Sequence, residues 1–425
     1  MLRIPASALT AVKLLTRDGL LLFLTRFVRL FAYGSLSLIL VFYLTGIGLD
    51  ESQTGLIFTL TLIGDTVISL YLTTQADRIG RRRMLIAGAI LMAAAGAGFA
   101  CTSNFFFLII AGTIGVISPT GNEVGPFLSI EQAALSQIVL DDVRTEVFAW
   151  YTLAGSLASA MGSLLGGLVT QALQRSVTTP VGSYRAIIIF YAAVGVFLAV
   201  VFRRLSAATE IPRRGEETQA SSVRSTFLGI GTASRKVVLK LSGLFAIDAF
   251  AGAFVVQSFA VYWFHLRFGA EPGTLGVIFF WANVFAGFSA LLASRLASRF
   301  GLVRTMVFTH LPSNVLLILV PLMPNLSLAT ALLLLRFSIS QMDVPTRQSY
   351  TMAVVRPEER SAAAGITTVA RTTGAAIAPF IAGLMFARPA LINVPFYMAG
   401  TLKIVYDLLL YHDFKSIKPP EESEQ

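Results

Sequence analysis

The chain has 425 residues, of which 55% are hydrophobic and 13% charged, and its mean hydropathy is +0.74. A soluble protein carries about 25% charged residues, so this composition excludes a soluble multidomain protein and indicates a polytopic membrane protein. The net charge of +10 does not indicate a nucleic-acid binder, because no soluble stretch is long enough to fold into a basic module. The single cysteine, Cys101, excludes an internal disulfide, and the three histidines lie far apart in sequence, so we expect neither a metal nor a cofactor.

Hydrophobic runs of about 20 residues, the length that spans a bilayer, recur along the whole chain. Six of them precede a polar segment at 203–237, near 22–45, 52–75, 84–102, 105–138, 145–172 and 184–202. Six more follow it, near 238–264, 273–294, 302–323, 327–354, 361–386 and 390–411. The sequence therefore predicts an all-α membrane protein of twelve transmembrane helices. Residues 1–202 and 238–425 would form two six-helix bundles, the second with a short cytoplasmic tail, joined by a cytoplasmic linker at 203–237.

The positive residues set the orientation of these helices. With both termini in the cytoplasm, 23 lysines and arginines lie on the cytoplasmic side and only four on the opposite side. Because cytoplasmic loops carry an excess of lysine and arginine, this asymmetry indicates an even number of crossings with both termini cytoplasmic.

Two sets of matches indicate that the second half repeats the first. A shift of 221 residues superimposes "QADRIGRRRM" on "LASRFGLVRT", and a shift of 216 superimposes "EQAALSQIVLDDVRTE" on "RQSYTMAVVRPEERSA". The matches follow one order at nearly one spacing. Parallel repeats of this kind, related by an axis along the membrane normal, are typical of secondary transporters.

The loop between the second and third predicted helices reads "DRIGRRR" (77–83). It resembles the signature of the major facilitator superfamily, roughly G-x-x-x-D-R-x-G-R-R. The matching residues are Asp77, Arg78, Gly80, Arg81 and Arg82, and Thr73 stands in place of the leading glycine. The resemblance implies a fold of two pseudo-symmetric six-helix bundles. It also implies that Asp77, Arg78, Gly80 and Arg81 form a cytoplasmic latch that opens and closes during alternating access.

The fifth and eleventh predicted helices carry glycine-rich segments. "GSLLGG" (162–167) resembles the end of a signature found in exporters of this family, G-P-x-x-G-G, with Ser163 in place of the proline. "APFIAG" (378–383) keeps the proline as Pro379. Because small residues also allow close helix packing in lipid, an exporter signature and a packing role both remain open.

Ionisable residues inside the predicted spans mark candidate functional sites, because a charge in a bilayer is expensive. The resemblance implies that helices 1, 4, 7 and 10 line the central cavity, and these helices carry most of the charges. The candidates are Arg26, Arg29, Asn122, Glu123, Glu131, Asp248, Asp343 and Arg347, with Arg371 on helix 11 and Tyr33 and Gln257 as polar cavity walls.

Helices 4 and 10 give the sharpest predictions. The segment "SPTGNEVGP" (118–126) should interrupt helix 4 near mid-membrane and expose Glu123 to the cavity, although a simple proline kink is an alternative. On helix 10, the spacing of Arg336, Ser340, Asp343 and Arg347 predicts a polar stripe on one face of a continuous helix that lines the cavity. The alternative is an ion pair between Asp343 and Arg347, four residues apart, that only shapes the helix.

Two ion pairs are expected from position alone. Glu131 and Arg347 are equivalent under the repeat, so we expect them to meet across the cavity axis in one conformation and to separate in another. Lys403 and Asp407 on helix 12 lie four residues apart and are expected to pair with each other in a structural role.

These features predict a transporter rather than an enzyme, since there is no phosphate-binding G-x-x-x-x-G-K-[ST] loop and no nucleophile–histidine–acid set. We expect a secondary active transporter that moves a small polar or amphipathic organic solute by alternating access. Transport would be proton-coupled, with Glu123 and Asp343 as the main proton carriers, and directed outward. The alternatives are facilitative or proton-coupled uptake of an organic anion or nutrient, and a non-transporting sensor on the same fold.

The expected partners follow from this reading. They are a small-molecule substrate, a proton and the lipid bilayer, without nucleic acid. The chain is expected to work as a monomer in a plasma membrane or a bacterial inner membrane.

Overall fold

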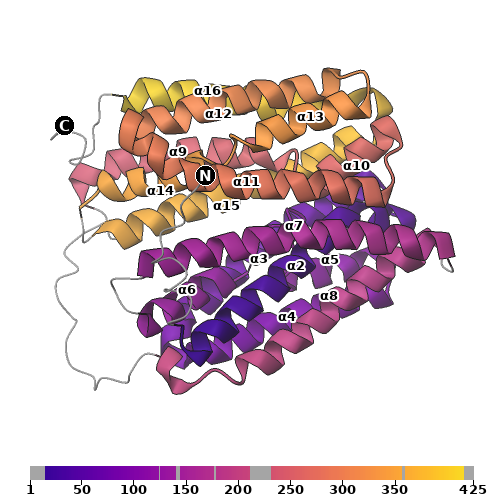
Figure 1. Cartoon of the computed structure of the whole chain (residues 1–425), viewed down its shortest axis with the longest axis horizontal. Coiled ribbons are helices and arrows are strands. Elements are labelled where there is room, and N and C mark those ends of the chain that lie inside the picture. Colours follow the sequence, from indigo (N-terminus) through magenta and orange to yellow (C-terminus); the bar gives the residue numbers. More distant parts are fainter. Residues whose placement is uncertain are drawn as a thin grey trace, which may run out of the picture. The chain divides into compact units, whose positions relative to one another are not determined.

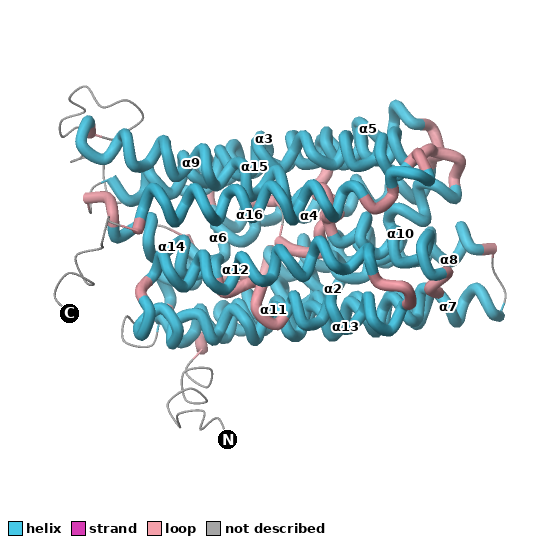
Figure 2. The backbone as a smooth tube through the Cα atoms, turned by 90° about the horizontal axis from the view of Figure 1, so that it is seen from above, coloured by secondary structure: helices cyan, strands magenta, loops and turns pink. Residues whose placement is uncertain are grey.

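The computed structural model describes residues 15–123, 125–139, 144–176, 179–210, 231–356 and 359–415. Within these ranges the regular structure is helical and contains no strand, which confirms the predicted all-α class (Figures 1 and 2). The chain divides into two compact units. The first comprises Met1–Arg213 with Ala260–Phe280, and the second comprises Arg214–Phe259 with Trp281–Gln425. Residues 260–280, expected in the C-terminal bundle, therefore group with the first unit.

The first unit contains seven α-helices that follow one another along the chain. They are α2 (Arg17–Gly46), α3 (Glu51–Ile79), α4 (Arg81–Cys101), α5 (Phe105–Ile114), α6 (Phe127–Ile138), α7 (Arg144–Ser176) and α8 (Pro180–Phe202), followed by the short 3₁₀ turn η1 (Ala207–Thr209). Most of α10 (Gln257–Phe268) and the first turns of α11 (Pro272–Phe300) also belong to it. α3 begins with a capping box in which the Ser52 hydroxyl and the Gln53 N–H lower the pKa of the Asp50 carboxyl.

The second unit contains the remaining part of α11 and the helices of the second half. They are α9 (Thr232–Ala253), α12 (Leu302–Leu319), α13 (Leu326–Phe337), α14 (Asp343–Ala353), α15 (Arg360–Phe386) and α16 (Val394–Phe414), with 3₁₀ turns η2 (Val320–Leu322) and η4 (Pro389–Leu391).

Nine helical stretches among the described residues are long and apolar enough to cross a membrane. They coincide with the predicted spans one to three, five to nine and eleven. The predicted fourth and tenth spans are each divided into two shorter helices, α5 with α6 and α13 with α14. The predicted seventh span is divided into α9 and α10 by a turn at 254–256, and the predicted twelfth span is α16. Each of the twelve predicted spans thus has a helical counterpart.

The break in the tenth span contradicts the predicted continuous helix. α13 ends at Phe337 and α14 starts at Asp343, with turns between them. Pro345 lies in the first turn of α14, where its missing N–H is tolerated, whereas inside a continuous helix its ring would clash with the carbonyl four residues earlier. The expected single polar face from Arg336 to Arg347 is therefore wrong.

The two units repeat the same helix pairs. In the first unit α2 packs along α7 and α4 along α8, and in the second unit α9 packs along α15 and α12 along α16 (Figure 1). These pairs join the first with the fifth span, and the third with the sixth, of each half. The packing agrees with the repeat that the sequence shifts indicated.

Glycines bring the backbones of α2 and α7 into contact. A Cβ atom built on Gly34 would lie 2.1 Å from the backbone oxygen of Ser159, and one built on Gly162 would lie 2.0 Å from that of Phe31. The Ser35 hydroxyl uses this closeness to donate to the Gly162 carbonyl at 2.9 Å. Small residues at such crossings are how helices associate closely in lipid.

Substituting Gly34 with alanine is expected to destabilise the protein by about 1–3 kcal/mol, because the added methyl forces α2 away from α7. The matched control is Gly243→Ala on α9, where an added Cβ meets nothing within 4 Å. Thermal unfolding of both variants in the same detergent would show a lower Tm for Gly34→Ala only. Equal Tm values would refute the close crossing.

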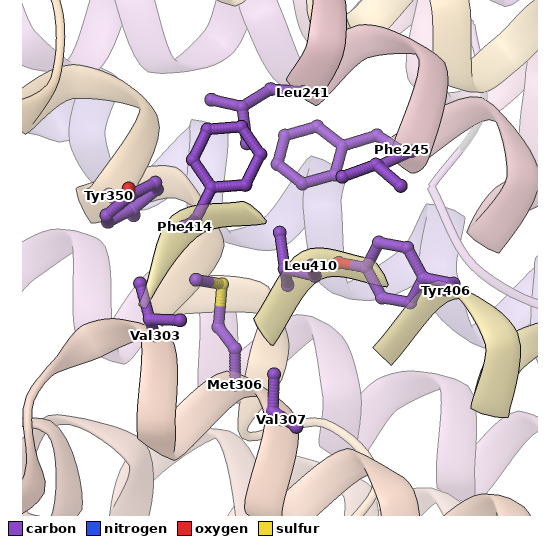
Figure 3. Packing of buried hydrophobic residues seen from close by; sticks show 10 residues of the cluster. Leu241, Phe245, Val303, Met306, Val307, Tyr350, Tyr406, Leu410 and Phe414 are labelled. Carbon is purple, nitrogen blue, oxygen red and sulfur yellow. The ribbon is translucent and has the colours of Figure 1, made fainter. Parts of the chain in front are cut away.

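An apolar cluster in the second unit joins α9, α12, α14 and α16 (Figure 3). Phe245, Tyr350, Tyr406 and Phe414 surround Met306 and its neighbours, and all of them are buried. Phe245 lies three residues before Asp248 on α9. The cluster therefore fixes the helices that carry the charged side chains described next.

Candidate functional site

A fully buried ion pair joins α2 to α6 in the first unit. The Arg29 guanidinium donates from Nη1 to Oε1 of Glu131 at 2.8 Å and from Nη2 to Oε2 at 2.6 Å, and neither side chain is exposed. Thr25 donates to the same carboxylate at 3.0 Å, and Tyr151 of α7 donates to it as well. This bidentate geometry, with the remaining acceptor sites filled, is what makes a buried pair tolerable.

Glu123 extends this pair into a cluster of four charges. Its carboxylate accepts from Nε of Arg29 at 2.8 Å and from Nη1 of Arg26 at 3.0 Å, and it remains 12% exposed. Arg26 also lies over the Tyr151 ring, 4.4 Å from its centroid. Two arginines and two glutamates make the cluster neutral, and Glu123 is its most accessible carboxylate.

The break in the fourth span places Glu123. Between α5 and α6 the backbone of residues 115–126 is irregular, apart from Val124, which lies outside the described residues. Gly121 and Gly125 adopt positive φ angles of 70° and 81°, which glycine adopts without steric cost. Ser159 of α7 donates to the Gly121 carbonyl at 2.7 Å and thereby holds the break in place. The predicted interruption of helix 4 is confirmed.

Asp248 of α9 is the centre of a second cluster, in the second unit. Its Oδ2 atom accepts from Nη1 of Arg347 at 3.0 Å and lies 3.5 Å from Nη1 of Arg371, and Lys403 of α16 donates to Oδ1. Asp343 contacts the same Arg347 nitrogen at 3.1 Å. One carboxylate thus joins cations from three helices.

The partners of Lys403 and Asp407 correct the predicted ion pair on helix 12. Lys403 pairs with Asp248, while Asp407 contacts Nδ1 of His310 at 2.9 Å and accepts from Asn314 at 2.9 Å. Both partners of Asp407 lie on α12, the helix against which α16 packs. Lys403 therefore belongs to the charged cluster and not to a separate structural pair.

The internal repeat suggested an ion pair between Glu131 and Arg347. In the structure, each of these two side chains has partners inside its own unit. Glu131 binds Arg29, and Arg347 binds Asp248 and Asp343. A Glu131–Arg347 pair would require both side chains to leave these buried partners. Tyr151, Lys403 and His310 were absent from the predicted site, although an intramembrane lysine is a signal that the sequence did offer.

The other predicted wall residues lie outside both clusters. Tyr33 is fully buried and packs near Tyr191, with ring centroids 6.1 Å apart. Gln257 begins α10 and accepts from Asn283 of α11 at 3.2 Å. Asn122 is exposed beside Glu123, and its amide donates to the Thr120 carbonyl at 3.4 Å.

The "DRIGRRR" loop forms a sharp junction between α3 and α4. Gly80 has φ of 117°, and the next residue, Arg81, is buried with Nη1 donating to the Ala133 carbonyl at 3.1 Å and to Gln137 at 2.7 Å. The Glu210 carboxylate accepts from the Arg81 backbone N–H at 2.7 Å, so it satisfies a free donor at the start of α4. Arg78 is exposed, and the side chain of Asp77 lies outside the described residues.

The two clusters contain ionisable groups but no metal-binding arrangement. Among the described residues, no group of three histidine, cysteine, aspartate or glutamate side chains could hold a metal ion. Charged side chains that meet in the middle of apolar spans, one of them beside a broken helix, are suited to binding a polar solute or a proton.

Comparison with known proteins identifies relatives across almost the whole chain. The family profile described as Major Facilitator Superfamily matches residues 22–379. An uncharacterized membrane protein of Saccharomyces cerevisiae is 30% identical over 424 residues, which cover 94% of each chain.

Solved structures show the same similarity in the fold. The structure of the nucleoside transporter NupG has a TM-score of 0.73 at 14% identity and covers 94% of this chain and 100% of that chain. The D-xylose-proton symporter has a TM-score of 0.69 at 15% identity, over 94% of this chain and 98% of that chain. Identities this low establish a shared fold only.

Proposed function

Because the chain belongs to the Major Facilitator Superfamily, we propose that it is a secondary active transporter coupled to protons. It moves a small polar or amphipathic organic solute across a membrane by alternating access, as a monomer with both termini in the cytoplasm. The observation that carries this proposal is Glu123, a partly exposed carboxylate at the break of the fourth span.

Glu123 is suited to carry the coupling proton. It is 12% exposed, whereas Glu131 is fully buried behind it, so a proton reaches Glu123 first. Protonation removes the charge that holds Arg26 and Arg29 at 3.0 and 2.8 Å. Both arginines lie on α2, so the attachment of α2 to the break in the fourth span would weaken, while Arg29 keeps its pair with Glu131 of α6. Asp343, which shares Arg347 with Asp248, is the corresponding proton carrier proposed for the second unit.

The cytoplasmic latch is assigned to Asp77 and Arg78. Arg81 donates to carbonyls and a side chain of its own unit, so it fixes the shape of the loop. Arg78 is exposed and available to a partner in the other half of the transporter. Gly80, with its positive φ, sets the turn between these residues.

The proposed direction is export. It is supported by the similarity of "GSLLGG" in α7 to the exporter signature. Gly162 and Gly166 of this segment contact the backbone of α2, the helix that carries Arg26 and Arg29. The segment therefore lies where a change in packing would reach the Glu123 cluster.

The test is flux in proteoliposomes with and without an imposed pH gradient, measured over a panel of labelled organic solutes. Glu123→Gln is expected to abolish proton-driven accumulation, because the side chain keeps its shape but no longer ionises. Solute exchange at equal pH on both sides should persist. Asp413→Asn, at the cytoplasmic end of α16, is the control and should behave like the wild type. Gradient-driven transport that survives in Glu123→Gln would reject this residue as the proton carrier.

A further inference from the structure

The cluster around Asp248 has more positive than negative charge. Arg347, Arg371 and Lys403 share two carboxylates, Asp248 and Asp343. The third acid nearby, Asp407, is engaged by His310 and Asn314 instead. Arg336 of α13 adds a fourth cation that interacts with Asp343 and Asp248. Four cations thus face three acids, Asp407 included, inside a transmembrane unit. In the first unit, by contrast, two arginines and two glutamates balance.

Arg371 is the cation with the weakest attachment. It lies 3.5 Å from Asp248, compared with 3.0 Å for Arg347, and its side chain is 34% exposed, compared with 7%. The buried nitrogen Nη1 of Arg371 makes no hydrogen bond. Arg371 lies well inside the span Ala362–Phe386, where a charged group with a third of its surface free has to face water or protein rather than lipid.

The α15 surface beside Arg371 is polar and open. Thr368 is exposed, Thr372 is partly exposed, and their positions one turn apart place them on the arc next to Arg371. Gly365 continues this arc, and a Cβ built there would meet nothing within 4 Å. A guanidinium, two threonine side chains and an unobstructed glycine thus lie next to one another on α15.

Resting on the transport function proposed above, we propose that the solute carries a carboxylate and that this carboxylate binds the guanidinium of Arg371. A cation would be repelled by the three positive side chains, and a neutral solute would leave the surplus charge in place. A carboxylate neutralises it, and the guanidinium fork accepts two carboxylate oxygens at once. The ligand would replace Asp248 as the main partner of Arg371 while Arg347 and Lys403 keep Asp248.

The surplus charge can be measured without knowing the solute. Thr368→Cys is introduced together with Cys101→Ser, which removes the only native cysteine. Its modification rate is measured with the anionic sulfonatoethyl and the cationic trimethylammonioethyl methanethiosulfonates. The ratio of anionic to cationic rates is expected to be roughly tenfold higher than at native Cys101. This ratio should fall toward the Cys101 value when Arg371→Gln is added.

The matched control is Arg304→Gln. Arg304 is an exposed arginine on α12, and its substitution should leave the ratio of anionic to cationic rates unchanged.

The carboxylate itself is tested by protection of the same cysteine. Benzoate, nicotinate and hippurate are expected to slow the modification, and their uncharged amides are not. Protection should be lost in Arg371→Gln. It should be partly retained in Arg371→Lys, which keeps the positive charge but lacks the paired N–H donors of the guanidinium. The proposal would be overturned if the ratio of anionic to cationic modification rates did not change in Arg371→Gln. It would also be overturned if the amides protected the cysteine as well as the carboxylates do.

The outcome is distinguishable from a failure of the transport function. Carboxylate protection without any flux in proteoliposomes would reject transport and keep the anion site. Flux of neutral solutes without a preference for carboxylates would reject the anion site and keep transport.

Discussion

Replacing Arg29 with methionine is expected to destabilise the protein by about 3–5 kcal/mol, the typical cost of removing one partner of a buried ion pair. Arg29 is completely buried and holds two carboxylates, Glu131 through two bonds and Glu123 through one. Its removal leaves Glu131 with only the hydroxyls of Thr25 and Tyr151. Arg26 would then be the one arginine left in the cluster to balance the negative charges of Glu123 and Glu131.

The double variant Arg29→Met/Glu131→Gln separates the cost of an unpaired charge from the value of the pair. Since a neutral pair leaves no buried charge, we expect the double variant to regain most of the lost stability. The measurement is the free energy of unfolding in mixed detergent and SDS micelles.

The control is Arg175→Met. Arg175 pairs with Glu271 at 3.2 Å, but both side chains are more than half exposed. Exposed pairs contribute about 0–1 kcal/mol, so this variant should unfold almost like the wild type. If Arg29→Met were as mild as Arg175→Met, the buried cluster would not be a main source of stability in the first unit.

Local sequence signals were sufficient for the spans and for one of the three breaks within them, which lie in the fourth, seventh and tenth spans. The length of a hydrophobic run identifies a membrane span without any knowledge of the neighbouring helices. The segment "SPTGNEVGP" combines two prolines with two glycines, so the break around Glu123 could be predicted. The break in the tenth span was missed. Its only strong signal is Pro345, and the even spacing of polar residues across it matched a helix equally well.

The partners of the charged residues could not be predicted from sequence. Spacing within one helix suggested Lys403 with Asp407, and pseudo-symmetry suggested Glu131 with Arg347. The structure instead pairs Lys403 with Asp248 and Glu131 with Arg29. The suggestion for Lys403 fails because a nearly uniform apolar helix carries little information about which face it turns toward which neighbour. That choice depends on close contacts such as those of Gly34 and Gly162. A Glu131–Arg347 pair stays a prediction for another conformation.

Asp248→Asn is expected to have the largest effect in the second unit, abolishing transport and lowering stability by about 3–5 kcal/mol. Asp248 is the acid that Arg347, Lys403 and Arg371 all contact within 4.0 Å. With it neutralised, Arg371 and Lys403 lose the acid that they contact, and Arg347 keeps Asp343. Stability is measured by unfolding and transport by proteoliposome flux. The partly exposed pair between Lys240 and Asp413 supplies the control, and Asp413→Asn should leave both measurements close to the wild type.

A second substitution distinguishes the structural role of Asp248 from its role in transport. In Asp248→Asn/Lys403→Met one cation is removed together with the acid, which leaves Arg347 and Arg371 with Asp343. We expect stability to recover in part while transport stays absent, because Arg371 then has no acid that can exchange with a bound solute. Recovery of both stability and transport would mean that Asp248 serves only to balance charge. Recovery of neither would mean that Lys403 contributes through packing against α9, where a Cβ built on Gly252 would lie 3.4 Å from its Nζ.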